Sequence, residues 1–247
     1  MKVKPVAIGK TKPIGIIGAM AEEVAALLAA MKGGEVEEIA GLAFHQGELW
    51  GVPCVVAECG PGKVNAAACA QAMALRYTPR LIINVGVAGG VGDKVRIGDL
   101  VVAAACVQYD FDTTAMGDPL ATLFIRHAGQ GTEKITLLPC CEEAAAVLLE
   151  EARSIYGGAH FGVVCTGDAF VADPEKGLFL HREFEAQAVE MEGGAIAQVC
   201  YMNNTPCAVL RAISDCANND SPVDFPAFTK MAAEKTAKLL EAALPRL

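Results

Sequence analysis

Short apolar runs that end in glycine or in a polar residue recur along the chain, and they predict buried β-strands. The runs cover residues 14–18, 81–85, 160–165 and 207–213, and the stretch 95–112 begins as a strand and passes into a polar loop. Two further runs, 42–50 and 52–60, flank Gly51 and predict a hairpin. Residues 81–85 are apolar except for Asn84, which suits a strand buried on both faces.

Other stretches have the spacing of amphipathic helices. In residues 19–31, Val24, Leu27, Leu28 and Met31 fall on one helical face. The remaining predicted helices cover 64–77, 142–156 and 225–244, and Pro245 ends the last of them.

The alternation of strands and helices predicts one α/β domain over residues 14–247, behind an extension at 1–13. We expect a single three-layer domain with a mixed, largely parallel central β-sheet flanked by helices. Residues 113–131 carry no clear period and are interpreted as a long excursion on the surface or at a subunit contact.

Composition excludes several classes of function. The 247 residues are 53% hydrophobic, enough for a large core, yet no uninterrupted apolar run approaches the roughly 18 residues of a membrane span. Lys10, Lys12 and two prolines interrupt the N-terminal stretch, which disfavours a signal peptide. The formal charge is −9 and no basic cluster exceeds two residues, so nucleic-acid and membrane partners are not expected.

The cysteines and histidines show no metal-binding or disulfide pattern. Most of the ten cysteines lie in apolar runs, and Cys140-Cys141 is adjacent rather than C-x-x-C. We therefore expect reduced core thiols and a cytoplasmic protein. The four histidines lack ligand spacing, so neither a metal nor another cofactor is expected; they are His45, His127, His160 and His181.

Three glycine-rich segments follow predicted strands. The first, at Gly15 to Gly18, lacks the G-x-G-x-x-G order of a dinucleotide site. The second, at Gly60 to Lys63, is not a P-loop, but its backbone N–H groups at a helix start could bind an anion or hydroxyl. The third, at 86–90, is expected to be a loop that leaves room for a ligand against bare backbone.

Two predicted strands end in acidic groups. Glu190 and Glu192 follow the end of one strand, and Asp215 follows the end of the other. Ligands of open α/β sheets bind beyond the carboxyl ends of strands. The alternative for Asp215 is that it only caps a helix. Glu192 lies among small and apolar residues, where a carboxylate needs a partner in the protein or a ligand that supplies one.

Six motifs occur in a fixed order between residues 15 and 215: GIIGAMAEEV, GPGKVNAA, INVGVAGG, TGDAF, AVEME and RAISD. In this order they resemble the methylthioadenosine/S-adenosylhomocysteine nucleosidases of the nucleoside phosphorylase superfamily. The resemblance implies hydrolysis of the N-glycosidic bond of a small-molecule nucleoside substrate, without a cofactor, in a homodimer.

The resemblance also implies a role for each matching residue. Asp215 would protonate N7 of the adenine and Glu23 would activate the attacking water. Glu192 would hold the ribose 2′- and 3′-hydroxyls, with Met191 packing on the sugar.

The remaining positions of the family's site are substrate-binding. Phe170 would stack on the adenine, the Val171 backbone would read its edge, and Gly89 would line the ribose side. Arg211 and Ser214 would orient the acid and its loop. Glu190, Met20 and Phe225 complete the set.

The chain departs from the family pattern at two places. Val87 stands where some members carry a small hydroxyl residue. Met116 stands where some carry an aromatic, in a loop that in the family reaches the neighbouring subunit's 5′-substituent pocket.

Three alternatives stay open at this point. A phosphorylase would use phosphate in place of water and would need arginines and a hydroxyl around the glycines, where this chain offers Glu22, Glu23 and Val87. An aminofutalosine nucleosidase would share the adenine and ribose contacts. A nucleoside-binding protein without turnover would keep the fold alone.

Overall fold

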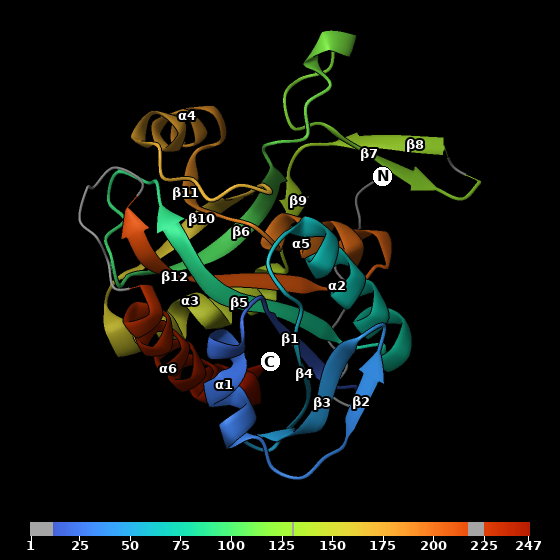
Figure 1. Cartoon of the computed structure of the whole chain (residues 1–247), viewed down its shortest axis with the longest axis vertical. Coiled ribbons are helices and arrows are strands. Elements are labelled where there is room, and N and C mark those ends of the chain that lie inside the picture. Colours follow the sequence, from blue (N-terminus) through green and yellow to red (C-terminus); the bar gives the residue numbers. More distant parts are fainter. Residues whose placement is uncertain (1–11, 130, 217–224) are drawn as a thin grey trace.

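The computed structural model describes residues 12–129, 131–216 and 225–247, and within it a mixed β-sheet is covered by helices on both faces (Figure 1). The strands are β1 (Ile14–Gly18), β2 (Val36–Ile39), β3 (Leu42–Leu49), β4 (Val52–Glu58), β5 (Leu81–Gly90), β6 (Leu100–Gln108), β7 (Leu123–His127), β8 (Gly131–Ile135), β9 (Leu138–Pro139), β10 (Ala159–Thr166), β11 (Ala186–Glu190) and β12 (Cys207–Cys216). The helices are α1 (Ala21–Ala30), α2 (Lys63–Tyr77), α3 (Glu142–Tyr156), α4 (Pro174–Phe184), α5 (Gly193–Met202) and α6 (Phe225–Ala243), with single 3₁₀ turns η1 (Thr114–Met116) and η2 (Leu244–Arg246).

The main sheet has the strand order β11-β10-β6-β12-β5-β1-β4-β3-β2. β1, β4, β5 and β12 pair in parallel, as do β6, β10 and β11, whereas β12 and β6 are antiparallel. An additional antiparallel pairing joins β11 to β5 through Ala188–Gly90 and Val189–Gly89. Five strands therefore close into a ring, which brings the end of β11 beside the ends of β5 and β12.

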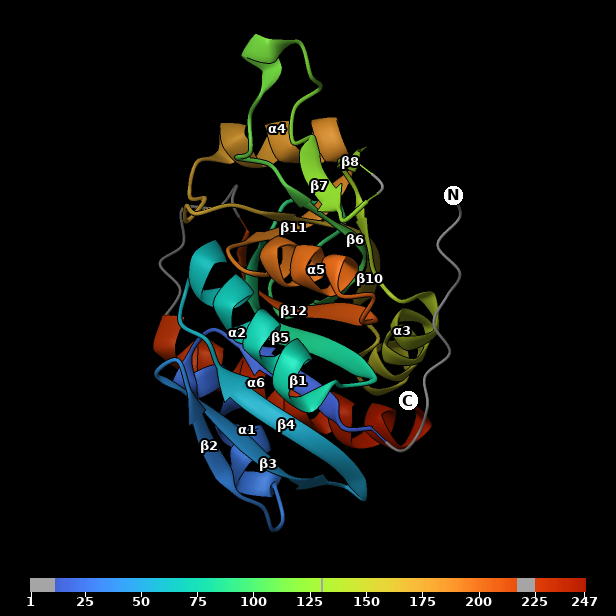
Figure 2. The ribbon, with the colours of Figure 1, turned by 90° about the vertical axis from the view of Figure 1, so that its right-hand side faces the viewer.

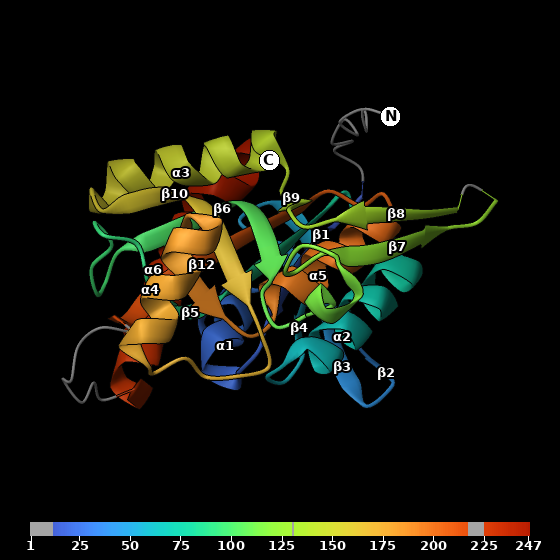
Figure 3. The same ribbon diagram turned by 90° about the horizontal axis from the view of Figure 1, so that it is seen from above.

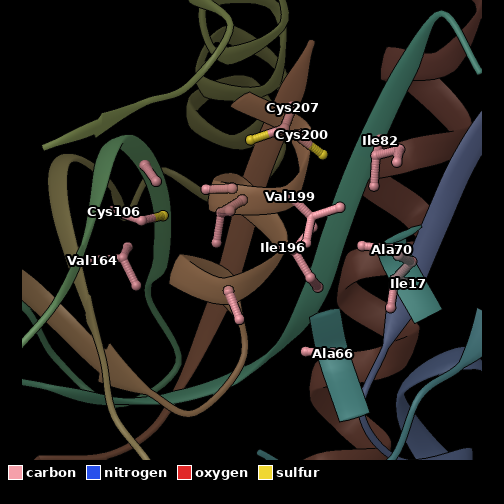
Figure 4. Packing of buried hydrophobic residues seen from close by; sticks show 14 of the residues in the cluster. Ile17, Ala66, Ala70, Ile82, Cys106, Val164, Ile196, Val199, Cys200 and Cys207 are labelled. Atoms are coloured by element: carbon pink, nitrogen blue, oxygen red, sulfur yellow. The ribbon is translucent and has the colours of Figure 1, made fainter. Parts of the chain in front are cut away.

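Both faces of the sheet are buried. Ile17 of β1 and Ile82 of β5 pack with α2 and α5 in one cluster, where Figure 4 shows Ala66, Ala70, Ile196 and Val199 around them. On the opposite face, neighbouring strand residues such as Ile16 and Ile83 pack with α1, α3 and α6 (Figures 2 and 3). The predicted three-layer α/β architecture is confirmed, because consecutive strand residues point to opposite faces and both are apolar.

Several predicted elements match closely. The helix predicted at 142–156 is α3, and the hairpin predicted at 42–60 is β3–β4. Its turn residues Trp50 and Gly51 both have positive φ, 49° and 85°, as a type I′ hairpin turn requires. The prediction did not assign α4, α5, β2, β7, β8 and β9.

The expectation of a glycine loop at 86–90 is wrong, because β5 continues as a strand to Gly90. These glycines instead create space for side chains from neighbouring elements. A Cβ on Gly86 would lie 2.5 Å from Glu23 Oε1 and 3.0 Å from Arg211 Nη1. On Gly89 it would lie 3.1 Å from Asp215 Oδ1. The missing side chains let three functional groups approach one strand.

Residues 113–131 leave the body of the protein as the prediction states, but they are not all irregular. The green segment at the top of Figure 1 carries η1, and it continues into the two-stranded sheet β7–β8. The Tyr201 hydroxyl on α5 donates to Glu133 on β8 at 3.0 Å, which ties this arm to the body.

The cysteines lie where the sequence predicts. The nine cysteine side chains that the structure describes are free, and all but Cys141 are buried. Cys106, Cys200 and Cys207 pack within the hydrophobic cluster of Figure 4. Among the described residues, no helix is long and apolar enough to cross a bilayer.

Candidate active site

A single buried guanidinium, that of Arg211, lies at the centre of a group of carboxylates. Arg211 comes from the middle of β12 and is 1% exposed. Its Nη2 donates to Glu190 Oε2 and to Asn84 Oδ1, and it lies 3.9 Å from Glu192 Oε2. A buried cation requires this kind of compensation, since removal from water costs several kcal/mol per ion.

Glu190, at the end of β11, is enclosed by protein donors. Besides Arg211, its Oε2 accepts from the backbone N–H groups of Glu192 and Gly193 at 2.9 and 2.7 Å. Its Oε1 accepts from the Thr166 hydroxyl. These four donors match the roughly four acceptor positions of a carboxylate, so Glu190 supports Arg211 and the start of α5. Its predicted place among the substrate contacts stays a prediction.

Glu23 is buried at the start of α1. Its Oε2 accepts from the N–H groups of Ala19 and Met20 at 2.7 and 3.0 Å, and its Oε1 accepts from Val87 at 2.9 Å. Burial raises the pKa of Glu23, and the charge of Arg211 and these N–H donors partly offset that rise. Three of about four acceptor positions are used, which leaves one on Oε1 for a ligand or water.

Glu192 follows β11 and is 7% exposed. Its Oε1 accepts from the N–H of Gly62 at 2.8 Å. Burial, with the neighbouring charge of Glu190, raises the pKa of Glu192 to about 7, against the opposing effect of Arg211. Unlike Glu190, Glu192 keeps acceptor capacity for a hydroxyl group.

Asp215 is the penultimate residue of β12, and a β-bulge sets its position. The register between β12 and β5 slips by one residue, so that Ile213 pairs with Ala88 and Asp215 with Gly89. Bulges of this kind re-aim side chains and occur next to active sites. Ser214 Oγ lies 2.8 Å from Asp215 Oδ2. Since Asp215 is within a strand, the helix-cap alternative for it is wrong.

Glu23 and Asp215 therefore both lie against the glycine-rich half of β5. Glu23 contacts the N–H of Val87, and Asp215 pairs with Gly89, two residues further. Two residues of a strand span roughly 7 Å.

The apolar members of the predicted site differ in exposure. Val171 is 9% exposed and Phe170 is 67% exposed, in the segment between β10 and α4. Met20 and Met191 are partly buried. Met20 lies three residues before Glu23, and Met191 directly precedes Glu192.

One predicted member, Met116, is not brought to this group. Met116 is 79% exposed on η1, in the arm. Phe225 begins α6, and its side chain lies outside the described residues.

The structure adds three residues that the prediction did not assign. Asn84 accepts from Arg211 and donates to the Ile17 carbonyl oxygen at 2.9 Å, Thr166 donates to Glu190, and Gly62 donates to Glu192. Asn84 was the one polar residue in an apolar strand, which was a usable indication. The N–H groups at the start of α2 do bind anions as predicted, but the anions are the protein's own carboxylates, Glu192 and Asp168.

The family model of the phosphorylase superfamily matches residues 13–245. The 5′-methylthioadenosine/S-adenosylhomocysteine nucleosidase of Shewanella loihica is 39% identical over 235 residues, covering 95% of this chain and 99% of that relative. The chain belongs to the 5′-methylthioadenosine/S-adenosylhomocysteine nucleosidase family. Its nucleoside phosphorylase-like fold is the one that the sequence predicted.

Solved structures of this family superpose over almost the whole chain. The nucleosidase of Neisseria meningitidis in complex with methylthio-immucillin-A gives a TM-score of 0.86 at 31% identity, covering 96% of this chain and 100% of that one. A mutant of the Helicobacter pylori nucleosidase, with 5′-methylthioadenosine in the active site, gives 0.86 at 33%, covering 96% and 99%. A futalosine hydrolase of Helicobacter pylori gives 0.85 at 33%, covering 96% and 98%.

The raised pKa of Glu192 predicts a particular pH dependence of stability. Between its ordinary value of 4.5 and about 7, the folded state keeps a proton that the unfolded state releases. This group therefore lowers the free energy of unfolding as pH rises through that window, by at most about 1.4 kcal/mol per pH unit. Glu192→Gln removes the titration. Urea unfolding from pH 4 to 8 should show the stability of wild type relative to the variant falling between pH 4.5 and 7 and level outside it.

A constant difference between the two proteins across that range would contradict the assignment. Glu22→Gln is the matched control, because Glu22 is exposed on the first turn of α1.

Proposed function

We propose that this protein hydrolyses the N-glycosidic bond of 5′-methylthioadenosine and S-adenosylhomocysteine, releasing adenine and the 5-thio-substituted ribose. The observation that carries the proposal is the buried Glu23 carboxylate, which accepts from three backbone N–H groups and has one acceptor position left. One of these N–H groups belongs to β5, the strand against which Asp215 also lies. Membership of the nucleosidase family supports the same reaction.

In the proposed reaction, Asp215 donates a proton to N7 of the adenine as the bond between C1′ and N9 breaks. Glu23 accepts a proton from the water whose oxygen forms the new bond to C1′. Negative charge leaving with the base is neutralised by the first transfer, and nearby carboxylates stabilise the positive charge that develops on the ribose. The scheme follows the two-carboxylate logic of glycoside hydrolysis.

The pKa of Glu23 supports its role as the base. Burial raises this pKa above its ordinary value, and a base is most effective when its pKa lies near the working pH. The three N–H donors fix the carboxylate so that Oε1 has its remaining position free. A positioned base of this kind contributes about 10²–10⁴ in rate.

Glu192 is proposed to hold the ribose hydroxyls. Its Oε2 has no hydrogen bond among the described residues and lies 3.9 Å from Arg211 Nη2. The support from Arg211 and Gly62 orients the carboxylate, and a hydroxyl is a donor that it can accept. Phe170 and Val171 are proposed as the adenine contacts, and Met20, Met191, Gly89 and Ser214 as the surrounding surface, with Phe225 added on resemblance.

The charges favour water over phosphate as the nucleophile. Two cationic side chains, those of Arg211 and Lys63, make hydrogen bonds among the described residues of this region. Each forms an ion pair with a carboxylate, Arg211 with Glu190 and Lys63 with Asp110. Phosphate binding requires donors that are free to contact the anion. Glu23 would repel phosphate at the position where its own Oε1 can bind water.

A second candidate is hydrolysis of aminofutalosine. The likeness to a structure named futalosine hydrolase, at a TM-score of 0.85, supports a related nucleoside with a different 5′-substituent as a candidate. The adenine and ribose contacts would be the same, so the distinction lies in the 5′-substituent.

We also propose a cytoplasmic homodimer that acts in methionine salvage. The free cysteines are typical of a reducing compartment. The exposed Met116, on an arm that projects from the body, fits the family's use of this loop at the neighbouring subunit.

The reaction class predicts turnover without phosphate. Purified protein in phosphate-free buffer should release adenine from methylthioadenosine and S-adenosylhomocysteine, with 5′-deoxyadenosine, aminofutalosine and inosine as comparison substrates. Added phosphate should leave the rate unchanged. If adenine release depended on phosphate, a phosphorylase would be favoured over a hydrolase. If nucleosides bound without product formation, the non-catalytic nucleoside-binding alternative would be favoured.

The roles of the two carboxylates predict different kinetic defects. Asp215→Asn should keep the fold and nucleoside binding but lose about 10²–10⁴ in kcat, because it lacks the acidic proton. Glu192→Ala should mainly raise KM, through loss of ribose binding. Asp93→Asn, at a side chain that is 84% exposed, is the matched control. Full activity of Asp215→Asn would contradict the proposed mechanism.

A further inference from the structure

A closed ring of hydrogen bonds through Lys63 joins the start of α2 to the segment after β6 and to the segment after β10, which carries the proposed adenine contacts. The Lys63 N–H, the first of α2, donates to Asp168 Oδ1 at 2.7 Å. The Asp168 N–H donates to Asp110 Oδ2 at 2.9 Å. The Lys63 ammonium closes the ring by donating to Asp110 Oδ1 at 2.6 Å. We call these three residues the Lys63 ring.

The ring connects the two halves of the proposed substrate site. Asp168 is two residues before Phe170, in the segment proposed to contact the adenine. Gly62, which precedes Lys63, donates to Glu192, the proposed ribose contact. Lys63 therefore links the segment that carries Phe170 to the carboxylate of Glu192.

The chemistry of the ring suits a positioning role. The start of a helix has free N–H groups and a positive dipole end, which favour the Asp168 carboxylate there. The Lys63 and Asp110 side chains are 18% and 30% exposed, so their ion pair is partly shielded from water. Gly62 has φ of 95° and an added Cβ would lie 3.2 Å from Asp168 Oδ1, so the turn needs glycine for Asp168 to approach.

We propose that Lys63 is a positioning residue that sets the adenine-contacting segment in place before substrate binds, acting through Asp110 and Asp168. The role rests on the proposed function for its kinetic consequences, but the ring itself can be tested without substrate. Because the lysine acts on a loop and not on the reacting atoms, its loss should weaken adenine binding more than it slows bond cleavage.

The test compares Lys63→Met with Arg76→Met. Both residues are on α2, and each makes an ion pair with a carboxylate of another segment; Arg76 pairs with Glu37 at 2.9 Å, at the opposite end of the helix. Lys63→Met keeps the backbone N–H that Asp168 accepts and removes only the ammonium. We expect it to weaken adenine binding and raise KM by up to about fivefold, the scale that the loss of a partly exposed ion pair produces, with a smaller change in kcat.

The second measurement is amide hydrogen exchange of the segment 166–171, with Asp168 resolved by NMR. Lys63→Met should accelerate exchange at Asp168, because Asp110 loses the ammonium that holds its carboxylate in place, while Arg76→Met should leave it unchanged. Asp110→Asn should reproduce the adenine defect, and the double variant Lys63→Met/Asp110→Asn should lose no more than the worse single variant.

The proposal is overturned if Lys63→Met and Arg76→Met match each other in adenine affinity, KM and exchange at Asp168, or if the double variant shows additive losses. These outcomes are separate from a failure of the proposed function. If wild type releases no adenine from any nucleoside, the exchange comparison still decides whether Lys63 holds the segment.

Discussion

The buried guanidinium of Arg211 is the group on which the site depends. It is one positive charge among Glu190, Glu192 and Glu23, all of which act on it electrostatically. A buried carboxylate without compensation is costly, and three of them on one side of a sheet could not remain ionised without a cation between them. Arg211 is itself held by Glu190 and Asn84, so the group is mutually supporting.

This balance is incomplete, and the imbalance suits the proposed chemistry. Burial raises the pKa of both Glu23 and Glu192 despite the attraction of Arg211. A carboxylate of this kind is a better proton acceptor than an exposed one. The local excess of negative charge also opposes phosphate. The same electrostatics would therefore favour water over phosphate as the nucleophile.

The backbone provides the space for this group. β5 ends in the five residues Gly86 to Gly90, three of them glycines, and the absence of their side chains lets Glu23, Arg211 and Asp215 approach the strand. The pairing of β11 with β5 then brings Glu190 and Glu192 to the same edge. A bulge at Ser214 sets Asp215 opposite Gly89.

The sequence predicted the layers, most elements and the carboxylates, because hydrophobic period and strand ends are local properties. The sequence predicted a loop at 86–90 because glycines weaken strands. In the structure, Glu23 and Arg211, which are distant in the sequence, lie so close to Gly86 that only glycine leaves room for them. The support given to Glu190 by Thr166, and the contacts of Gly62 and Lys63 with Glu192 and Asp168, join residues more than 20 positions apart. No local pattern contains such contacts.

The central claim, that one buried cation holds these carboxylates, is tested most directly by a double-mutant cycle on unfolding. Arg211→Met should cost about 3–5 kcal/mol, because it leaves buried carboxylates without their partner. Adding Glu190→Gln removes one of those charges, so urea unfolding should show Arg211→Met/Glu190→Gln to be at least as stable as Arg211→Met alone. If the losses of the two single variants simply add in the double variant, Arg211 and Glu190 do not depend on each other and the account is contradicted.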